Sequence, residues 1–391
     1  MNKSSLAARF GLPVISALSC LVAVSSARAD DHGSILKRLH RISTIASTVP
    51  ANGDVNPYGM AMVHRTEGRL KRGDILISNF NNSANLQGTG TTIVDVTQDG
   101  SVGVFAQIDA STLPGPCPGG VGLTTALVVL RGGWVIVGSL PTADGTSATA
   151  QAGCLIVLNS RGIPVETFSG SQINGPWDMA AFDRGSRVAL IVSNVLNGTV
   201  AGNGMVVKKG TVVRLDLNVS ESKMPSVEAL TVIASGLPER TDPAALVIGP
   251  TGLALSSACH SGAAIACETH EEMERGQVLY VADTLNNRIA TVADPLERTN
   301  SAGTGKTLTA GGSLNGPLGV AVARDGHILT VNANDGFITE ITPDGMQIAK
   351  KLLDDTGGPP PGAGTLFGLL TVQDNRIYFV DDGSNTLNLL R

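Results

Sequence analysis

The chain has 391 residues, of which 42% are hydrophobic, 16% are charged and only 3% are aromatic. Glycine accounts for 47 residues, well above the usual ~7%, and this composition disfavours helical bundles and coiled coils. The apolar content also disfavours disorder, because such a chain can bury a large core. The formal net charge is −5 and no cluster of Lys and Arg is visible in the sequence, so a nucleic-acid partner is not expected.

Residues 1–29 have the pattern of a secretory signal peptide. A basic start precedes the apolar run 10–24, and Ala27-Arg28-Ala29 is a small-x-small cleavage site. A lipoprotein anchored at Cys20 is a weaker alternative because the residues before it fit poorly. We therefore expect cleavage before Asp30, a periplasmic or secreted location, and an N-terminal linker over residues 30–39. No later apolar run reaches the ~18 residues of a membrane span.

The mature chain would keep 25 basic and 33 acidic residues, a formal charge of −8, and four cysteines. An even number of cysteines in an exported protein predicts disulfides. The expected pairs are Cys117 with Cys154, on one face of the fold, and Cys259 with Cys267. A zinc site around the second pair, with His260 and His270, is the weaker alternative, because zinc ligands are usually two to four residues apart.

One unit repeats six times along the chain. A turn with Gly or Pro leads into an apolar strand, clearest at Asn315-Gly316-Pro317-Leu318-Gly319-Val320. The six first strands lie in residues 56–62, 124–129, 175–180, 249–255, 315–322 and 366–371. Second strands are expected at 74–79, 134–139, 188–194, 278–283, 327–332 and 377–381. Third strands are expected at 92–96, 154–158, 211–215, 288–292, 337–341 and 386–390. Fourth strands are expected at 102–106, 164–168, 230–234, 306–310 and 347–352.

The sixth unit lacks a fourth strand, and residues 40–46 at the N-terminus supply a spare one. Pairing the two closes the ring and leaves no free sheet edge. The sequence therefore predicts an all-β fold, a six-bladed β-propeller, formed by residues 40–391 as a single domain.

Two blades resemble the NHL repeat. The matching segments are Gly276-Gln277-Val278-Leu279-Tyr280-Val281-Ala282-Asp283-Thr284-Leu285-Asn286-Asn287-Arg288-Ile289 and Pro317-Leu318-Gly319-Val320-Ala321-Val322. The resemblance implies a six-bladed propeller, with distant similarity to gluconolactonase-like propellers. It implies no single activity, because this architecture hosts many.

In propellers of this kind the starts of the first strands and the ends of the second strands meet at one mouth of the central channel. The residues expected there as ligand contacts are Tyr58, Asn79, Trp177, Asp178, Asn194, Asp283, Asn332, Phe367 and Asp381. The resemblance to gluconolactonase-like propellers implies that Asn194, Asp283, Asn332 and Asp381 hold a divalent cation such as calcium. Tyr58-Gly59 stands where that family has a Glu ligand. The structural alternative is that Asp and Asn at strand ends cap turns.

The sequence favours a binding or scaffold propeller acting through this mouth, with a protein, glycan or small molecule as partner. The alternative is a divalent-cation-dependent lactone or ester hydrolase of the gluconolactonase-like type. A lyase similar to the virginiamycin-cleaving propellers is a third hypothesis, and it is disfavoured because no histidine is expected at the mouth. The motifs G-x-S-x-G and H-E-x-x-H are absent from the sequence, so catalytic residues are not assigned and enzyme activity is left open.

Overall fold

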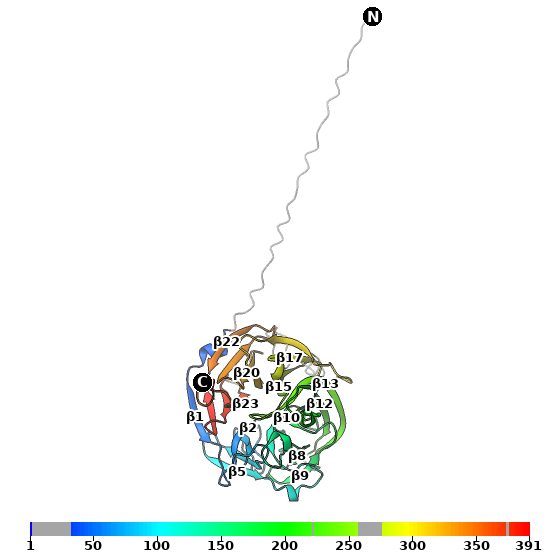
Figure 1. Cartoon of the computed structure of the whole chain (residues 1–391), viewed down its shortest axis with the longest axis vertical. Coiled ribbons are helices and arrows are strands. Elements are labelled where there is room, and N and C mark those ends of the chain that lie inside the picture. The colour runs from blue at the N-terminus through cyan, green and yellow to red at the C-terminus, as the bar shows by residue number, and fades with distance from the viewer. Residues whose placement is uncertain (2–32, 221–222, 257–275, 373–374) are drawn as a thin grey trace. The chain divides into compact units, whose positions relative to one another are not determined.

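The computed structural model describes residues 1, 33–220, 223–256, 276–372 and 375–391. Within these residues the strands form six antiparallel sheets, arranged as blades around a ring (Figure 1). The expected all-β, six-bladed propeller is therefore confirmed. In the part of the chain that the structure describes, no helix has the length and apolar character needed to cross a membrane.

Each blade has at least four strands. In the first five blades they follow one another in chain order from the centre of the ring to its rim, whereas the sixth takes its outermost strand from the N-terminal end of the fold. The first blade contains β2 (Val55–Met62), β3 (Ile75–Asn81), β4 (Thr92–Val96) and β5 (Val102–Gln107). The second contains β6 (Leu123–Val129), β7 (Val135–Ser139), β8 (Cys154–Leu158) and β9 (Pro164–Phe168). The third contains β10 (Pro176–Asp183), β11 (Arg187–Asn194), β12 (Val207–Asn218), β13 (Ser226–Asp242) and the short β14 (Leu246–Ile248).

The fourth blade contains β15 (Pro250–Ser256), β16 (Val278–Asp283), β17 (Arg288–Ala293) and β18 (Lys306–Ala310). The fifth contains β19 (Pro317–Val322), β20 (Ile328–Asn332), β21 (Phe337–Ile341) and β22 (Gln347–Leu352). The sixth contains β23 (Leu366–Thr371), β24 (Ile377–Asp381), β25 (Thr386–Leu390) and β1 (Ile42–Ser47). The clearest departure from expectation is the third blade, where β12 and β13 extend well beyond the core into a long hairpin.

The ring closes by pairing strands from the two ends of the fold. β1 lies antiparallel to β25, with Thr44 opposite Asn388, and their side chains are hydrogen-bonded at 2.9 Å. Figure 1 shows β1 beside the C-terminal strand. This closure removes the free edge that an open ring would expose.

Apolar side chains hold neighbouring blades together. Separate clusters of buried residues join the first blade to the second, the second to the third, the third to the fourth, and the fourth to the fifth. A further cluster spans the fifth, sixth and first blades, so the packing also closes around the ring. Middle strands such as β3 and β8 are wholly buried, whereas the outer strands β18 and β22 consist of exposed and half-buried residues.

The glycine of the repeated first-strand motif is required by close contact between blades. A Cβ on Gly319 would lie 2.2 Å from the carbonyl oxygen of Phe367, and a Cβ on Gly368 would lie 2.2 Å from that of Tyr58. No side chain fits at that distance, so only glycine lets adjacent first strands approach this closely.

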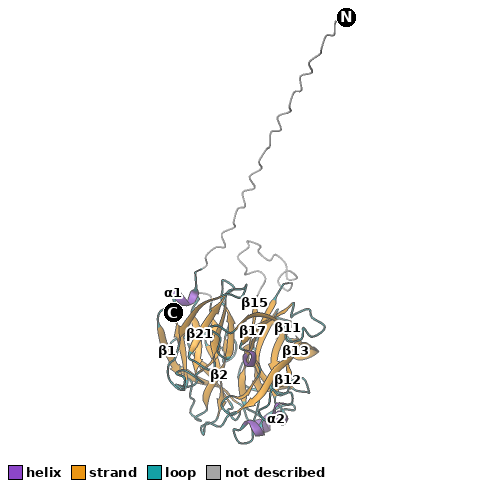
Figure 2. Ribbon diagram, turned by 45° about the horizontal axis from the view of Figure 1, so that its top comes forward, coloured by secondary structure: helices purple, strands orange, loops and turns teal. Residues whose placement is uncertain are grey.

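Part of the segment expected to be a linker is a docked helix. α1 (Ile35–Arg38) buries Ile35 and Leu36 at the rim of the fifth blade, near β22. The buried carboxylate of Glu340 accepts hydrogen bonds from the Ser34 hydroxyl and from the backbone N–H groups of Ile35 and Leu36. Figure 2 shows α1 and α2 (Thr199–Gly202) at opposite ends of the propeller.

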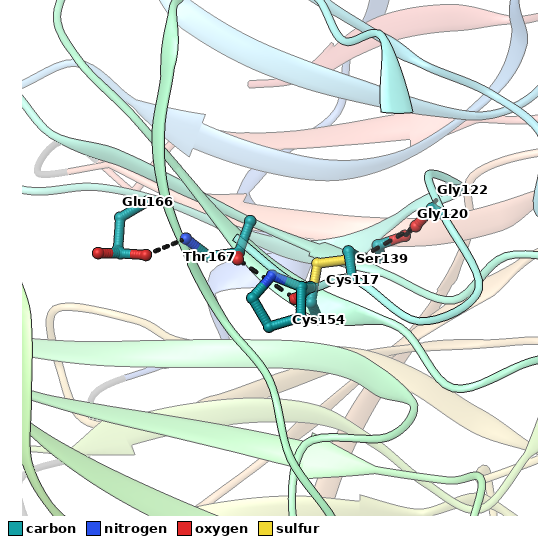
Figure 3. The surroundings of a disulfide bond; sticks show 8 residues. Cys117, Gly120, Gly122, Ser139, Cys154, Glu166 and Thr167 are labelled. Carbon is teal, nitrogen blue, oxygen red and sulfur yellow. Dashed lines mark hydrogen bonds between the residues drawn. A yellow bond between two sulfur atoms is a disulfide. The ribbon is translucent and has the colours of Figure 1, made fainter. Parts of the chain in front are cut away.

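The predicted disulfide between Cys117 and Cys154 is present, with the two Cα atoms 5.1 Å apart. It ties the loop before β6 to the start of β8 (Figure 3). Ser139 supports the same loop, since its hydroxyl donates to the carbonyl of Gly120 and accepts from the N–H of Gly122. The second predicted pair, Cys259 and Cys267, lies outside the described residues, as do the signal peptide and Cys20.

Candidate functional site

The candidate site is a cavity of about 740 Å³ on the mouth face, where first strands begin and second strands end. Five of the six blades contribute to it, the third through Trp177 and the β13–β14 hairpin. Its polar and aromatic lining residues are Asn56, Tyr58, Asn81, Asn85, Gln87, Trp177, Arg240, Asp242, Thr284, Asn287, Asn315, Asn334, Phe367 and Asp382. The cavity therefore combines an aromatic surface with many side-chain amides.

Four residues from the starts of first strands form the floor of this cavity. They are Tyr58, Trp177, Leu318 and Phe367, and each is at least nine-tenths buried. The Tyr58 ring is stacked against Phe367 at a centroid distance of 4.0 Å and against Phe80 at 4.7 Å. A second cavity lies along the channel beneath them and shares no lining residue with the first. The floor thus separates the mouth from the rest of the channel.

The walls are rich in carboxamides that hold one another in place. The Asn81 Nδ2 atom donates to Asn85 Oδ1 at 2.6 Å, and Asn334 Nδ2 donates to Asn315 Oδ1 at 3.3 Å. Asn287 accepts from the N–H of Gly316 and donates to a backbone carbonyl. Each carboxamide has two donor hydrogens and two acceptor lone pairs, so such bonds leave further donors and acceptors for a ligand.

The cavity has little net charge. Arg240 and Asp242 neutralise one another in an ion pair of 2.8 Å. Burial, together with the neighbouring Asp381, raises the pKa of Asp382 to about 7. Asp382 is therefore only partly ionised at neutral pH, and it is the one other charged group among the lining residues that the structure describes.

The β13–β14 hairpin partly roofs the cavity. Arg240, Asp242, Ala244 and Ala245 line the cavity, and Leu246 and Val247 pack in the same apolar cluster as the floor. The Gln87 amide, from the first blade, donates to the carbonyl of Ala244 at 3.0 Å. The third-blade hairpin is thereby fastened to a first-blade loop.

Of the residues that the sequence singled out, Tyr58, Trp177 and Phe367 line the mouth cavity. The ends of the second strands, Asn79, Asn194, Asp283, Asn332 and Asp381, are buried and are not among its lining residues.

Several of these strand-end side chains are hydrogen-bonded to the backbone of nearby segments. Asn79 donates to the carbonyl of Thr48. Asp381 accepts from the N–H of Ser384, and burial raises its pKa. The assignment of these residues as ligand contacts stays a prediction.

Two of the four predicted cation ligands have their side chains engaged within the fold. Asp283 forms a 2.7 Å ion pair with Arg288, and Asn332 is hydrogen-bonded through both its amide oxygen and its amide nitrogen. Asn194, in contrast, has both amide atoms buried without a partner among the described residues. Asp283 Oδ1 is likewise buried without a hydrogen-bond partner among the described residues, but none of the four side chains lines the mouth cavity.

Asp178 lines the channel below the floor instead of the mouth. Its carboxylate accepts from the N–H of Met179 and, across the blade boundary, from that of Leu253, both at 2.8 Å. Burial outweighs these hydrogen bonds and raises the pKa of Asp178 to about 7. Asp178 occupies the position that is glycine in other copies of the first-strand motif, such as Pro317-Leu318-Gly319. Its hydrogen bond with the N–H of Leu253 links the third blade to the fourth.

A possible metal-binding triad lies on the opposite face. Among the described residues, Asp325, His327 and Glu340 bring their ligand atoms within 4.8 Å of one another. The Glu340 carboxylate already accepts hydrogen bonds from Ser34, Ile35 and Leu36, and it lies 2.7 Å from His327 Nδ1. Through these hydrogen bonds Glu340 anchors the N-terminal segment.

The sequence analysis missed the amide walls because the lining residues follow the strand ends that it selected. Asn81 lies two residues after Asn79, and Asp382 directly follows Asp381. Adjacent residues along an extended chain point to opposite sides, so Asp382 lines the cavity whereas Asp381 does not. The runs of Asn after the second strands were the available signal. No comparable sequence pattern indicated that the β13–β14 hairpin would cover the cavity.

No protein-family model matches the chain, and no curated protein matches its sequence. Solved structures match its fold. A gluconolactonase from Xanthomonas campestris is 14% identical, covering 90% of this chain and 88% of that one, with a TM-score of 0.51. A luciferin-regenerating enzyme is 11% identical, with coverages of 90% and 94% and a TM-score of 0.54. A calcium-binding regucalcin from Agrobacterium tumefaciens is 11% identical, with coverages of 89% and 93% and a TM-score of 0.48.

At these identities the likenesses to the gluconolactonase and the luciferin-regenerating enzyme show a shared propeller fold and carry no activity over to this chain. The NHL label remains a resemblance of two blades, because neither a family model nor a sequence match supports it.

Proposed function

We propose that this protein is an exported propeller that binds a small, neutral, hydroxyl-rich ligand, such as a sugar or cyclic polyol, in the mouth cavity. The observation that carries the proposal is the ring of carboxamides above an aromatic floor. Amides match hydroxyl groups because each offers both donors and acceptors. Aromatic surface suits the apolar face of such a ligand.

The electrostatics of the cavity favour a neutral ligand over a charged one. The Arg240–Asp242 pair cancels its own charge, and Asp382 has a pKa of about 7. A strongly charged ligand would lose hydration without gaining a full counter-charge, which is costly. Export is supported by the signal-peptide pattern and by the Cys117–Cys154 disulfide, because disulfides persist mainly in oxidising compartments.

Tryptophan fluorescence gives a direct test. The chain has two tryptophans, so Trp134→Phe leaves Trp177, in the cavity floor, as the single reporter. We expect saturable fluorescence changes with glucose or inositol and weaker ones with gluconate and glucosamine. Asn85→Ala combined with Asn334→Ala should weaken binding by about tenfold or more, since each hydrogen bond contributes about 0.5–1.5 kcal/mol.

The matched control is Asn300→Ala, an exposed asparagine that does not line the cavity. It should bind as the parent does. Tighter binding of the charged analogues, or no saturable change with any neutral compound of a wide sugar and polyol panel, would refute the proposal.

One observation favours the alternative, a lactone or ester hydrolase. Asp382, with its pKa near 7, is suited to act as a general base at neutral pH, and its carboxylate with nearby amide oxygens offers the ligand type that calcium prefers. The test is hydrolysis of lactones and aryl esters with and without divalent cations, beside the metal content of the purified protein. Activity that is lost in Asp382→Asn would support the hydrolase. Absence of both activity and bound metal would exclude it and leave the binding proposal standing.

A further inference from the structure

The channel below the mouth floor is a second large cavity in the propeller. It has a volume of about 740 Å³ and is lined by the first strands of all six blades, β2, β6, β10, β15, β19 and β23. Most of its lining side chains are apolar, among them Met60, Leu127 and Leu369 from three different blades. A cavity of this size, with an apolar lining and a few polar groups, is typical of sites for small molecules.

Asp178 is the ionisable side chain at the upper end of this channel. Its neighbours Trp177 and Met179 are buried, whereas Asp178 is only half-buried because its side chain borders the channel. Its two carboxylate oxygens each accept one backbone N–H, from Met179 and from Leu253, at 2.8 Å. These bonds fix the direction of the carboxylate and leave each oxygen a lone pair for a ligand. Among the described residues, no basic side chain forms an ion pair with Asp178.

The other ionisable side chains of the lining lie at the lower end of the channel. They are His64, Arg131 and Asp183, and Asp183 is about 16 Å from Asp178 along the extended strand β10. Burial is the main cause that lowers the pKa of His64, and Arg131 and Arg72 lower it further against the effect of Asp183, so the ring is neutral at pH 7. Arg131 and Asp183 carry opposite charges, and the Asp183 carboxylate accepts the backbone N–H of Arg131. The charge of Asp178 is therefore the one left uncompensated among the described residues of the lining.

These charges favour a cationic ligand in the channel over an anionic one. A buried carboxylate without a counter-charge is costly, and an ammonium group supplies both the charge and three hydrogen-bond donors. The apolar lining below Asp178 suits a hydrocarbon chain or ring, because burying such surface is favourable. An anion would be repelled by Asp178, and a neutral alcohol would offer a hydrogen bond without the charge.

We propose that the channel is a second binding site, for a primary amine that carries an apolar chain or ring. The ammonium group binds Asp178, and the apolar part extends down the channel. The ligand enters from the face opposite the mouth, since Tyr58, Trp177, Leu318 and Phe367 close the other end. The site does not depend on the function proposed for the mouth.

The first test is calorimetry of the mature protein at pH 8 with three ligands of equal chain length, octylammonium, 1-octanol and octanoate. At this pH Asp178, with its pKa of about 7, is mostly ionised, and the amine is still protonated. We expect one saturable site for octylammonium, with an affinity at least tenfold higher than for octanol, and octanoate should bind more weakly still. Affinity should rise about fourfold per methylene from butylammonium to octylammonium, because each added CH₂ is buried.

Variants locate the ligand in the channel. Asp178→Asn removes the charge with little change in size and should bind octylammonium and octanol about equally. The matched control is Asp344→Asn, at an exposed aspartate outside the channel, which should keep the preference of the parent. Met62→Trp keeps the carboxylate but narrows the channel, so it should weaken octylammonium binding at least tenfold even if Asp178→Asn does not fold.

Four results would overturn the proposal. They are equal affinity of the parent for octylammonium and octanol, no saturable binding, an unchanged preference in Asp178→Asn, and unchanged binding in Met62→Trp.

The mouth variants separate this site from the proposed mouth function. Asn85→Ala/Asn334→Ala, which should weaken sugar binding, should leave the affinity for octylammonium unchanged. If that variant loses octylammonium and Asp178→Asn keeps it, the amine is bound in the mouth and the channel proposal is wrong. If the parent binds sugars but no alkyl ligand, the channel proposal fails and the mouth proposal stands.

Discussion

The anchoring of the N-terminal segment by Glu340 leads to a prediction whose size follows from the hydrogen bonds. The Oε1 atom accepts the N–H of Ile35 at 2.9 Å, and Oε2 accepts that of Leu36 at 3.0 Å. In Glu340→Gln one of these acceptors becomes an NH₂ group. Whichever way the amide turns, one backbone N–H then faces another donor.

Losing a hydrogen bond to a buried charged group costs about 1.5–3 kcal/mol, and the unsatisfied donor adds to this. We expect α1 to be destabilised by about 2–4 kcal/mol, which raises the population of the undocked segment by about 30- to 700-fold. Burial opposes the charge of Glu340, but hydrogen bonds from Ser34, His327, Leu36 and Ile35 outweigh it and hold its pKa below the usual value. The anchor should therefore be complete near neutral pH and be lost as the pH falls through that lowered pKa.

Limited trypsin digestion measures this undocking, because Lys37 and Arg38 are exposed basic residues within α1. Cleavage at these two sites, followed by intact mass, should be faster in Glu340→Gln by the factor given above when opening is rapid relative to cleavage. Glu297→Gln, at an exposed glutamate, is the matched control. Cleavage rates within twofold of one another for Glu340→Gln, the control and the parent would refute the reasoning.

Three further predictions concern the stability of the ring. Gly368→Ala should lower the free energy of unfolding in urea by about 2 kcal/mol or more, because a Cβ there meets backbone at 2.2 Å, whereas Gly103→Ala has open space and should change little. Cys117→Ser/Cys154→Ser opens a loop whose ends are 37 residues apart and should cost about 3–4 kcal/mol; unchanged urea midpoints would contradict this. The pKa of Asp178 is raised to about 7 in the fold. Its contribution to the free energy of unfolding should therefore be most favourable in acid and be lost as the pH rises to 7. Asp178→Asn should remove that part of the pH dependence of unfolding.

The architecture could be predicted from the sequence because it depends on short-range patterns. Glycine or proline before an apolar strand, repeated six times, is sufficient to indicate blades, and the spare N-terminal strand indicates closure. The expected third strands 92–96, 154–158, 337–341 and 386–390 match β4, β8, β21 and β25. The disulfide between Cys117 and Cys154 followed from the same register, since both cysteines fall on the mouth face of one blade.

The candidate sites could be predicted only in part. Tyr58, Trp177 and Phe367 lie at the starts of first strands, and that position alone places them around the channel. Whether a carboxamide lies in the cavity wall depends on the direction in which its side chain points at the end of the strand. The roof depends on the β13–β14 hairpin reaching a first-blade loop through Gln87.

The sequence by itself determined the blade repeat and the closure of the ring, because these follow from strand periodicity and from the spare N-terminal strand. Only the tertiary structure decided which side chains share a cavity. Met60 and Asp178 are 118 residues apart in the chain and line one channel because the first strands of all six blades surround it. Charge and hydrogen-bonding capacity act over a few ångströms in space, so a sequence that scatters the residues of a site cannot by itself show it.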